Sequence, residues 1–379
     1  MSNFLRYAQD KQAEIVALIS ELAACESPSD APAAVNRFVD LFIEKTGDVA
    51  SAKTFESAKF GKTLRLEFKL PGEAKQGQVL ALGHSDTVWP IGTVKTMPVN
   101  VADGRLWGPG VLDMKAGLVF FVFAMRALLD LNIPLKSEVA LLVVPDEEVG
   151  STSSRAITEE EAKRSKCVLV LEPGTGFAGK LKTARKGVGD YQVFIKGKAA
   201  HAGVDFTSGA SAIVEAARQI SEIAKFTDLD RGITVNPGVI SGGTRSNVIA
   251  ETARVHVDVR VNRLPDAGEL DAKFRALKAK DDRCSVWVEG GLNRPPMERT
   301  EEIAALFYKA RALGEAMGVS IEESSTGGGS DGNFTAALGV PTLDGLGGVG
   351  EGAHAPNESI LLDRVADRVA LLAALVAEI

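Results

Sequence analysis

The chain has 379 residues, of which 45% are hydrophobic and 25% charged, and its net charge is −7 at pH 7. This length exceeds one ordinary core, so we expect two domains, or one large domain with an insert. The acidic balance argues against a nucleic-acid backbone as the main partner. No apolar run approaches the length of a membrane helix.

The N-terminal stretch is charged and amphipathic, and it lacks the apolar segment of a secretory signal. The three cysteines are scattered and form no C-x-x-C pair; they are Cys25, Cys167 and Cys284. Both features predict a cytoplasmic protein with reduced, structural cysteines.

The first 180 residues predict an α/β pattern. Helices are expected over 3–24, 31–46 and 114–131, and strands over 63–70, 78–82, 138–144 and 167–171. Strands that alternate with helices are typical of a mostly parallel sheet covered by helices on both faces.

The pattern changes near residue 180. Strands are expected over 188–196, 233–240, 252–261 and 283–289, with helices over 211–225 and 267–280. This β-α-β-β-α-β order is that of a ferredoxin-like α+β domain. We therefore predict an inserted domain over 181–292, and a main α/β domain formed by 1–180 and 293–379.

The α/β pattern returns after the Pro-Pro pair at 295–296. A helix is expected over 300–317, a strand over 319–323, an apolar run over 340–343 and a C-terminal helix over 360–379.

Ligand-type side chains stand at the ends of the predicted strands. His84 and Asp86 follow the run 78–82, and Asp113 comes just before a predicted helix. Open α/β sheets bind ligands at such ends, and imidazole and carboxylate groups suit zinc. Asp86 is placed to accept the second ring N–H of His84. A loop histidine beside a solvated aspartate is the alternative for this pair alone.

Further strand ends carry the same residue types. Glu147 and Glu148 follow one buried strand, Glu172 follows the next, and His354 lies in a glycine-rich loop. With His84 and Asp113 these make two histidines and three carboxylates, about what two zinc ions need if one carboxylate bridges them. Glu147 is then available as general base. Each residue alone also fits a solvated turn or a surface loop, so the prediction depends on their convergence.

The stretch 345–350 fits the pattern G-x-G-x-x-G of dinucleotide-binding proteins. That function needs a helix to begin there, whereas a loop sequence follows at 351–356. We therefore expect these glycines to position His354 and to let the backbone approach a substrate.

Seven stretches resemble, in order, the two-zinc amidohydrolase and peptidase family that includes carboxypeptidase G, aminoacylase and succinyl-diaminopimelate desuccinylase. They cover nearly the whole chain and read GHSDTVWP, GPGVLDMKAG, PDEEVGS, LEPG, GKAAHAG, GGSDG and EGAHAPNE. The resemblance is greatest to the carboxypeptidase G branch, through Thr87-Val88 and through Lys180, eight residues after Glu172.

The resemblance implies a role for each predicted ligand. His84 and Glu172 would bind one zinc, and Glu148 and His354 the other. Asp113 would bridge the two ions, with a cis peptide bond to the next residue. Asp86 would orient the first histidine, and Glu147 would be the base. Two zinc ions per subunit are therefore expected, with cobalt or manganese as substitutes.

The resemblance also gives the insert a function. The 181–292 domain would be the family's lid, which in many members forms a homodimer. His201 would stabilise the oxyanion, often across the dimer, while Asn247 and Arg260 would hold the substrate's carboxylate. Lys180 and, more weakly, Arg294 are candidates for binding an acidic side chain of the substrate, although a solvated strand face explains Lys180 equally well. Gly329 completes the predicted substrate-binding set.

The function predicted from these residues is zinc-dependent hydrolysis of an amide bond. The reaction would release a C-terminal amino acid, glutamate, from an N-acyl or short peptide substrate. An N-acyl-amino-acid amidohydrolase or a dipeptidase of the same family is the alternative. A non-catalytic binding module is a further alternative, but such a module has no need of Glu147.

Overall fold

The computed structural model describes residues 3–379, which form two compact units. The first unit holds the residues up to Ala184 together with Arg299–Ser325 and Ser330–Ile379. The second unit holds Arg185–Glu298 and Thr326–Gly329. The short segment belongs to the second unit because the Lys186 amide donates to the Thr326 carbonyl over 3.0 Å and the Arg185 guanidinium donates to the Gly329 carbonyl over 2.8 Å.

The first unit has helices on a central sheet. Its helices are α1 (Asn3–Asp10), α2 (Gln12–Ala24), α3 (Pro32–Thr46), α4 (Ala116–Asp130), α5 (Arg155–Lys163), α8 (Glu301–Ala316), α9 (Gly332–Ala337) and α10 (Val365–Glu378). Its central strands are β1 (Ala50–Phe55), β2 (Thr63–Phe68), β3 (Gln78–His84), β6 (Glu138–Val144), β7 (Ser165–Val170) and β14 (Thr342–Leu343).

The central sheet has the order β1-β2-β6-β3-β7-β14. The pairs β6–β3, β3–β7 and β7–β14 are parallel, whereas β1–β2 and β2–β6 are antiparallel. This arrangement confirms the predicted α/β class with a mostly parallel sheet. Strand β3 lies in the middle and is buried along its whole length, as expected for a strand covered on both faces.

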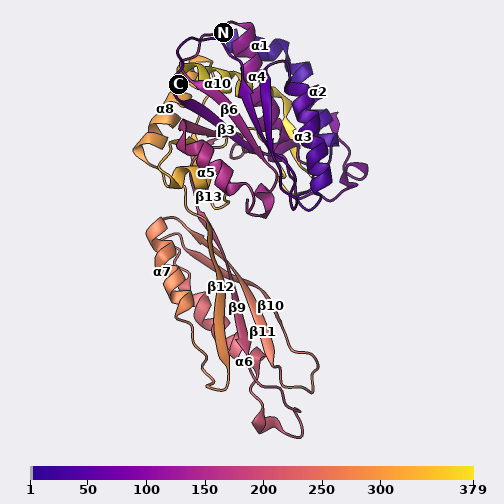
Figure 1. Ribbon diagram of the computed structural model, residues 1–379, viewed down its shortest axis with the longest axis vertical. Helices are drawn as coiled ribbons and strands as arrows, with labels where there is room; N and C mark the ends of the chain where they lie inside the picture. The colour runs from indigo at the N-terminus through magenta and orange to yellow at the C-terminus, as the bar shows by residue number, and fades with distance from the viewer. Residues whose placement is uncertain (1–2) are drawn as a thin grey trace. The chain divides into compact units, whose positions relative to one another are not determined.

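Alternation along the strands builds a core on each face of the sheet. Val79 and Ala81 of β3 belong to the core that also contains α2, α4 and α10, whereas Leu80 and Leu82 belong to the core beneath α5. Side chains of a strand point to opposite faces with a period of two residues. The first unit is therefore a three-layer α/β/α structure (Figure 1).

A second, smaller sheet in the first unit joins two distant parts of the chain. It has the order β15-β16-β5-β4, with β4 (Asn100–Ala102), β5 (Arg105–Trp107), β15 (Gly350–Glu351) and β16 (Ser359–Leu361). Strand β16 pairs with β5 in antiparallel register. Strand β5 precedes Asp113, and the β15–β16 loop contains His354, so this sheet anchors both segments. Strands β8 (Leu181–Arg185) and β13 (Glu323–Thr326) pair separately.

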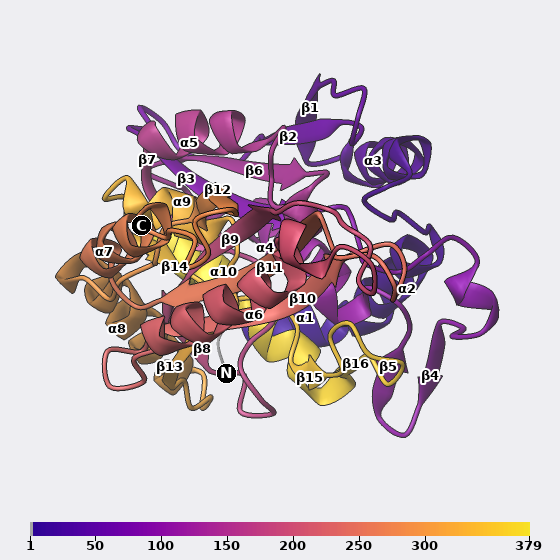
Figure 2. The ribbon, with the colours of Figure 1, turned by 90° about the horizontal axis from the view of Figure 1, so that it is seen from below.

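The second unit is an antiparallel sheet with two helices packed on it (Figure 1, Figure 2). Its elements in chain order are β9 (Gly187–Lys196), α6 (Ala212–Ile223), β10 (Thr234–Gly242), β11 (Thr252–Val261), α7 (Leu264–Arg275) and β12 (Ser285–Arg294). The sheet order is β10-β11-β9-β12. One core packs Val193, Val257, Ala216 and Phe274 together, so both helices cover the same face.

Several predicted elements end elsewhere in the structure. The helix predicted over 3–24 is broken at Lys11, because α1 packs on α10 and α4 while α2 packs on α4 and α3. Helix α7 begins earlier than predicted, with a proline in its first turn. The strand predicted over 319–323 lies at Glu323–Thr326, and the segment predicted as one C-terminal helix begins with β16. No helix between residues 3 and 379 has the length and apolar character that a bilayer crossing requires.

Helix α4 approaches the end of β7 at a glycine. A Cβ atom at Gly117 would lie 2.0 Å from the carbonyl oxygen of Leu171. This close approach fixes the helix against the segment that carries Glu172. By contrast, a Cβ atom at Gly268, an exposed position of α7, meets no described heavy atom within 4 Å.

We predict that Gly117→Ala destabilises the first unit by about 1–3 kcal/mol, because the methyl group forces the helix and the strand apart. Gly268→Ala is the matched control and should raise stability by about 0.5–1 kcal/mol, since glycine weakens a helix interior. Differential scanning calorimetry measures both changes. An unfolding temperature for Gly117→Ala at or above that of the unmodified protein would contradict the predicted contact.

Candidate metal centre

Neighbouring strands of the central sheet bring the predicted ligands to one edge. In the parallel registers, His84 lies opposite Val144, and Leu82 lies opposite Val170. The segments that follow β6 and β7 therefore emerge beside the end of β3. They carry Glu148 and Glu172.

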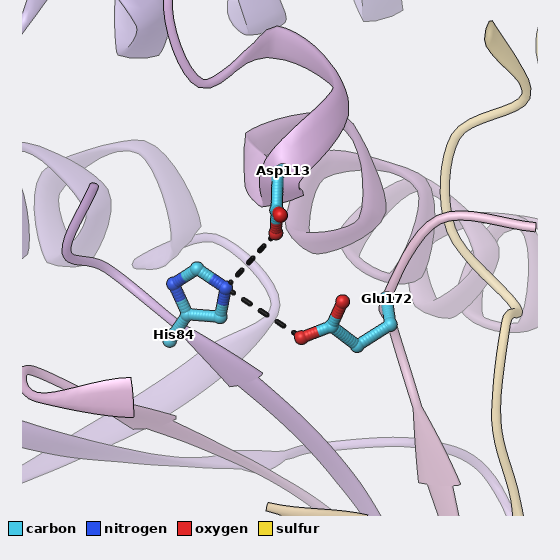
Figure 3. A group of neighbouring side chains, drawn as sticks. All are labelled: His84, Asp113 and Glu172. Carbon is cyan, nitrogen blue, oxygen red and sulfur yellow. Dashed lines mark hydrogen bonds and ion pairs between the residues drawn. The ribbon is translucent and has the colours of Figure 1, made fainter. Parts of the chain in front are cut away.

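The first group of ligand atoms surrounds His84. Its Nε2 lies 3.2 Å from Oδ1 of Asp113 and 3.6 Å from Oε1 of Glu172. Figure 3 shows the imidazole at the end of its strand, with the two carboxylates facing the same ring nitrogen. His84 and Glu172 are buried, so these atoms face one another with little solvent between them.

The second group shares Asp113 with the first. Nε2 of His354 lies 3.3 Å from Oδ2 of Asp113 and 3.2 Å from both carboxylate oxygens of Glu148. Oδ1 of Asp113 faces one histidine and Oδ2 faces the other. Among residues 3–379, the ligand atoms of each group lie within 4.8 Å of one another. The peptide bond from Asp113 to Met114 is cis.

This donor set fits two divalent cations. Each group offers one imidazole nitrogen, one further carboxylate and one oxygen of the shared Asp113, which suits transition-metal ions. Three carboxylates in such proximity repel one another unless positive charge lies between them. Three protein ligands per ion also leave a position for water or substrate.

The charges of the histidines follow from the same contacts. Hydrogen bonds with Asp113 and Glu148 raise the pKa of His354 to about 10. Burial opposes protonation of His84, but hydrogen bonds with Asp113 and Asp86 still hold its pKa well above the ordinary value. Burial acts to raise the pKa of Asp113, and the two histidines outweigh it and lower that pKa. Protons and cations therefore compete for this site, and cation binding releases protons.

Asp86 forms hydrogen bonds with the ring of His84 and also with groups in two other segments of the chain. The His84 Nδ1–H donates to the backbone carbonyl of Asp86 over 2.9 Å, while the Asp86 carboxylate lies farther away, at 3.4 Å. The nearer partner is thus the carbonyl, and it leaves Nε2 as the ligand atom. The carboxylate instead accepts the amide N–H groups of Glu147 and Glu148, both over 3.2 Å, and the hydroxyl of Ser29 over 2.7 Å.

Glu147 lies half-buried on the turn after β6. It lines a small cavity, of about 10 Å³, whose other lining residues include His84, Glu172 and Met114. The residue predicted as the base therefore adjoins the first ligand group, and Asp86 fixes its backbone.

Glu358 has a structural role that was not predicted from the sequence. It is fully buried, and its Oε1 accepts the amide N–H groups of Leu112 (2.9 Å) and Asp113 (3.1 Å). Its Oε2 accepts the Gly110 amide (2.9 Å) and the Trp89 indole N–H (2.8 Å). Burial raises the pKa of Glu358, and these donors oppose that shift. The carboxylate thus ties the His354 loop to the loop of Asp113.

His201, predicted to stabilise the oxyanion, and Asn247, predicted to bind the substrate carboxylate, are neighbours in the second unit. His201 pairs with Val248 in a short bridge, and the Ala202 amide donates to the Asn247 carbonyl over 3.0 Å. The Nδ1 atom of His201 accepts the amide N–H groups of Gly203 and Val204, both over 3.2 Å. Its other ring nitrogen, Nε2, is then the donor.

Basic residues predicted to bind substrate have partners within their own units. The Arg260 guanidinium donates to the Asp258 carboxylate over 2.8 and 3.0 Å. In the first unit, Nζ of Lys180 lies 2.6 Å from a carboxylate oxygen of Glu322.

Arg294 and Gly329 are close to each other in the second unit. Arg294 is buried, and a Cβ atom at Gly329 would lie 2.9 Å from its Cδ. A larger residue at 329 would therefore displace the arginine.

Comparison with known proteins assigns the family. The model of Peptidase family M20/M25/M40 matches residues 80–378. The chain belongs to this family. It is 28% identical to carboxypeptidase G2 of Pseudomonas sp. (strain RS-16), over 98% of this chain and 91% of that protein. It is 30% identical to succinyl-diaminopimelate desuccinylase of Psychrobacter arcticus, over 74% of this chain and 73% of that protein.

A solved structure agrees with this assignment. The aminopeptidase PepT from Bacillus cereus ATCC 10987 superimposes with a TM-score of 0.81 at 25% identity, over 97% of this chain and 98% of that chain. The chain is therefore a hydrolase of the metallopeptidase and amidohydrolase class. The resemblance seen in the sequence is confirmed, and the family is metal-dependent, as the ligand groups indicate.

We predict that Glu358→Gln destabilises the first unit by about 2–4 kcal/mol, because either orientation of the amide leaves two buried N–H donors without an acceptor. It should also lower the content of bound metal, since the Asp113 loop loses its anchor. Urea unfolding and elemental analysis measure the two effects.

The matched control is Glu351→Gln, in β15 of the same small sheet. Glu351 is partly exposed and pairs with Arg105, so its loss should cost about 0–1 kcal/mol. Equal stability and equal metal content of the two variants would show that Glu358 does not hold the Asp113 loop.

Proposed function

We propose that this protein is a two-zinc hydrolase that releases a C-terminal amino acid, preferably glutamate, from N-acyl or short peptide substrates. The observation that carries the proposal is the Asp113 carboxylate, which faces a histidine on each side. Glu147 lines the small cavity next to one of these histidines, His84. The similarity to carboxypeptidase G2 over nearly the whole chain supports the carboxypeptidase reaction.

The two groups of ligand atoms support an assignment of the residues that would hold the ions. His84 and Glu172 would hold one ion, Glu148 and His354 would hold the other, and Asp113 would contribute to both. Bound zinc would polarise the scissile carbonyl and lower the pKa of an attacking water.

The protein's own residues move the proton. Glu147 takes a proton from the water and passes it to the leaving amine. Asp86 holds the Glu147 backbone in place for this transfer. His201 donates from Nε2 to the developing oxyanion, a role supported by the backbone donors that occupy its Nδ1.

Cationic and amide side chains bind the leaving amino acid. Arg260 and Asn247 bind its α-carboxylate, while Lys180 and Arg294 bind the glutamate side chain. The ion pairs of Arg260 with Asp258 and of Lys180 with Glu322 are partly exposed. Such pairs are worth about 0–1 kcal/mol, so a substrate carboxylate can replace them.

An N-acyl-amino-acid amidohydrolase or a dipeptidase is the second candidate function. It is favoured by the 30% identity to succinyl-diaminopimelate desuccinylase. The two functions share the metal ligands and Glu147, and they differ in which amino acid leaves.

We further propose that the second unit is a lid through which two copies form a homodimer. Strand β10 is at an edge of its sheet and exposes Val239 and Ile240, and the first turn of α6 exposes Ile213 and Val214. Exposed apolar edge strands favour pairing with another chain.

The mass measured by light scattering should be twice the 40.0 kDa of one chain. Val239→Lys should lower this mass by weakening the dimer, whereas Val101→Lys, on the exposed strand β4, should leave it unchanged. A monomeric parent protein would contradict this proposal.

The proposed reaction predicts preferential release of glutamate by the zinc-loaded protein. The substrates share one acyl group and carry glutamate, aspartate, neutral or basic amino acids at the C-terminus. Glu147→Gln should retain zinc and lose about 10²–10⁴-fold in kcat, which is the usual contribution of a general base. Amino-acid release and metal content are measured on the same samples.

Each outcome separates the candidate functions. Release of neutral residues in preference to glutamate would favour the amidohydrolase or dipeptidase. Near-normal turnover of Glu147→Gln would remove Glu147 as the base, and no release from any substrate would contradict the hydrolytic function.

A further inference from the structure

Arg368 of α10 is a charged side chain inside the first unit, with only 1% of its surface exposed. Burial lowers the pKa of its guanidinium to about 10, so the group keeps its positive charge at neutral pH. Removing a charge from water is costly unless hydrogen bonds replace the lost hydration. Neither the ligand groups nor the proposed reaction uses this arginine, so its hydrogen bonds show what its burial is for.

Three backbone carbonyls surround the guanidinium of Arg368. Its Nε donates to the Gly347 carbonyl over 3.0 Å, one Nη donates to the Gly179 carbonyl over 3.0 Å, and the other Nη donates to the Gly345 carbonyl. Gly345 and Gly347 lie in the segment 345–348, which follows β14, and Gly179 lies in the loop after β7. The planar guanidinium has several donors in one fixed geometry, so it can hold both segments at once.

The segment 345–348 reaches the backbone of Glu172. The Gly347 amide donates to the Glu172 carbonyl over 2.8 Å, and the Gly174 amide donates to the Gly348 carbonyl over 2.9 Å. Gly347 is therefore fixed on both sides, by Arg368 through its carbonyl and by Glu172 through its amide. The Glu172 side chain extends from this backbone into the first ligand group (Figure 3).

The backbone around Gly347 is closely packed. A Cβ atom at this position would lie 2.1 Å from the carbonyl oxygen of Leu171, the residue before Glu172. Distances between zinc and a carboxylate oxygen are about 2.0–2.2 Å. A small displacement of this backbone would therefore take Glu172 out of reach of a cation held by His84 and Asp113.

The second ligand group has separate anchors. The segment 345–348 continues into β15 and the loop of His354, but the pairing of β15 with β16 and the hydrogen bonds of Glu358 fix that loop independently. Loss of the Arg368 hydrogen bonds should therefore displace Glu172 more than His354.

We propose that Arg368 is a positioning residue for Glu172, and that it sets the affinity of the metal position formed by His84, Asp113 and Glu172. This inference rests on the proposed function, in which Glu172 would bind one of the two ions. The arginine acts through hydrogen bonds to the backbone and touches neither an ion nor the substrate. Residues that orient metal ligands in this way typically contribute about 10–100-fold to metal affinity.

Arg368→Lys tests the proposal, because lysine keeps the positive charge but replaces the planar fork with a single nitrogen. Competition with a chelator measures the affinities of the two zinc ions. We expect one ion to bind about 10–100-fold more weakly and the other to bind as in the unmodified protein. Anomalous scattering from crystals should show the weaker peak among His84, Asp113 and Glu172.

Arg364→Lys is the matched control. Arg364 lies one turn before Arg368 and donates to the carbonyls of Phe177 and Ala178. Among residues 3–379, none of its hydrogen bonds reaches the segment 345–348, so both zinc affinities should stay unchanged. Leu375→Ala removes core volume from the same helix, and general destabilisation of this kind should weaken both ions alike or neither.

Gly347→Ala tests the same contact without altering a buried charge. Its methyl group would push the segment 345–348 away from Leu171 and should weaken the same ion as Arg368→Lys does. Equal weakening of both ions in these two variants, or affinities equal to those of the unmodified protein, would overturn the proposal.

Failure of the proposed function gives a different result. If the unmodified protein binds no zinc at Asp113, the ligand assignment is wrong, and hydrogen exchange of the metal-free proteins tests the contact by itself. Peptides that cover 344–350 should exchange faster in Arg368→Lys than in Arg364→Lys, which would support the positioning role of Arg368. Equal exchange of these peptides in the two variants would exclude that role.

Discussion

The position of one carboxylate, that of Asp113, governs the arrangement of the candidate site. Its two oxygens face His84 and His354, which are far apart in the chain. Like charges on Glu148 and Glu172 make this cluster unfavourable unless positive charge is shared between them. The rest of the first unit can be understood as the structure needed to hold these groups together.

Two carboxylates outside the ligand groups, those of Asp86 and Glu358, hold the loops that carry the ligands. Asp86 binds the backbone of the Glu147–Glu148 turn and the hydroxyl of Ser29, and so joins the N-terminal loop to the ends of β3 and β6. Glu358 binds the backbone around Asp113 from the loop that carries His354. Both use the carboxylate as an acceptor of backbone N–H groups, which fixes loops that lack regular secondary structure.

The sequence was sufficient to predict the parts of the site that follow long periodic elements. The buried runs of β3, β6 and β7 predicted a parallel sheet, and a parallel sheet predicts that residues such as Glu172 converge at one edge. The strands β5 and β16 were not predicted, because a strand of three residues carries no detectable periodicity. The contacts of Asp86 with Ser29 and the Glu147–Glu148 turn, and the partners of Glu358 and Lys180, could not be predicted, since each contact joins residues far apart in the chain. The glutamate that ends the motif EGAHAPNE was the available signal for Glu358.

Anomalous scattering at the zinc absorption edge, measured on crystals of the zinc-loaded protein, shows whether two cations share Asp113. We expect two peaks roughly 3.5–4 Å apart, one among His84, Asp113 and Glu172 and the other among Asp113, Glu148 and His354. A single peak, or two ions that do not have Asp113 in common, would contradict it.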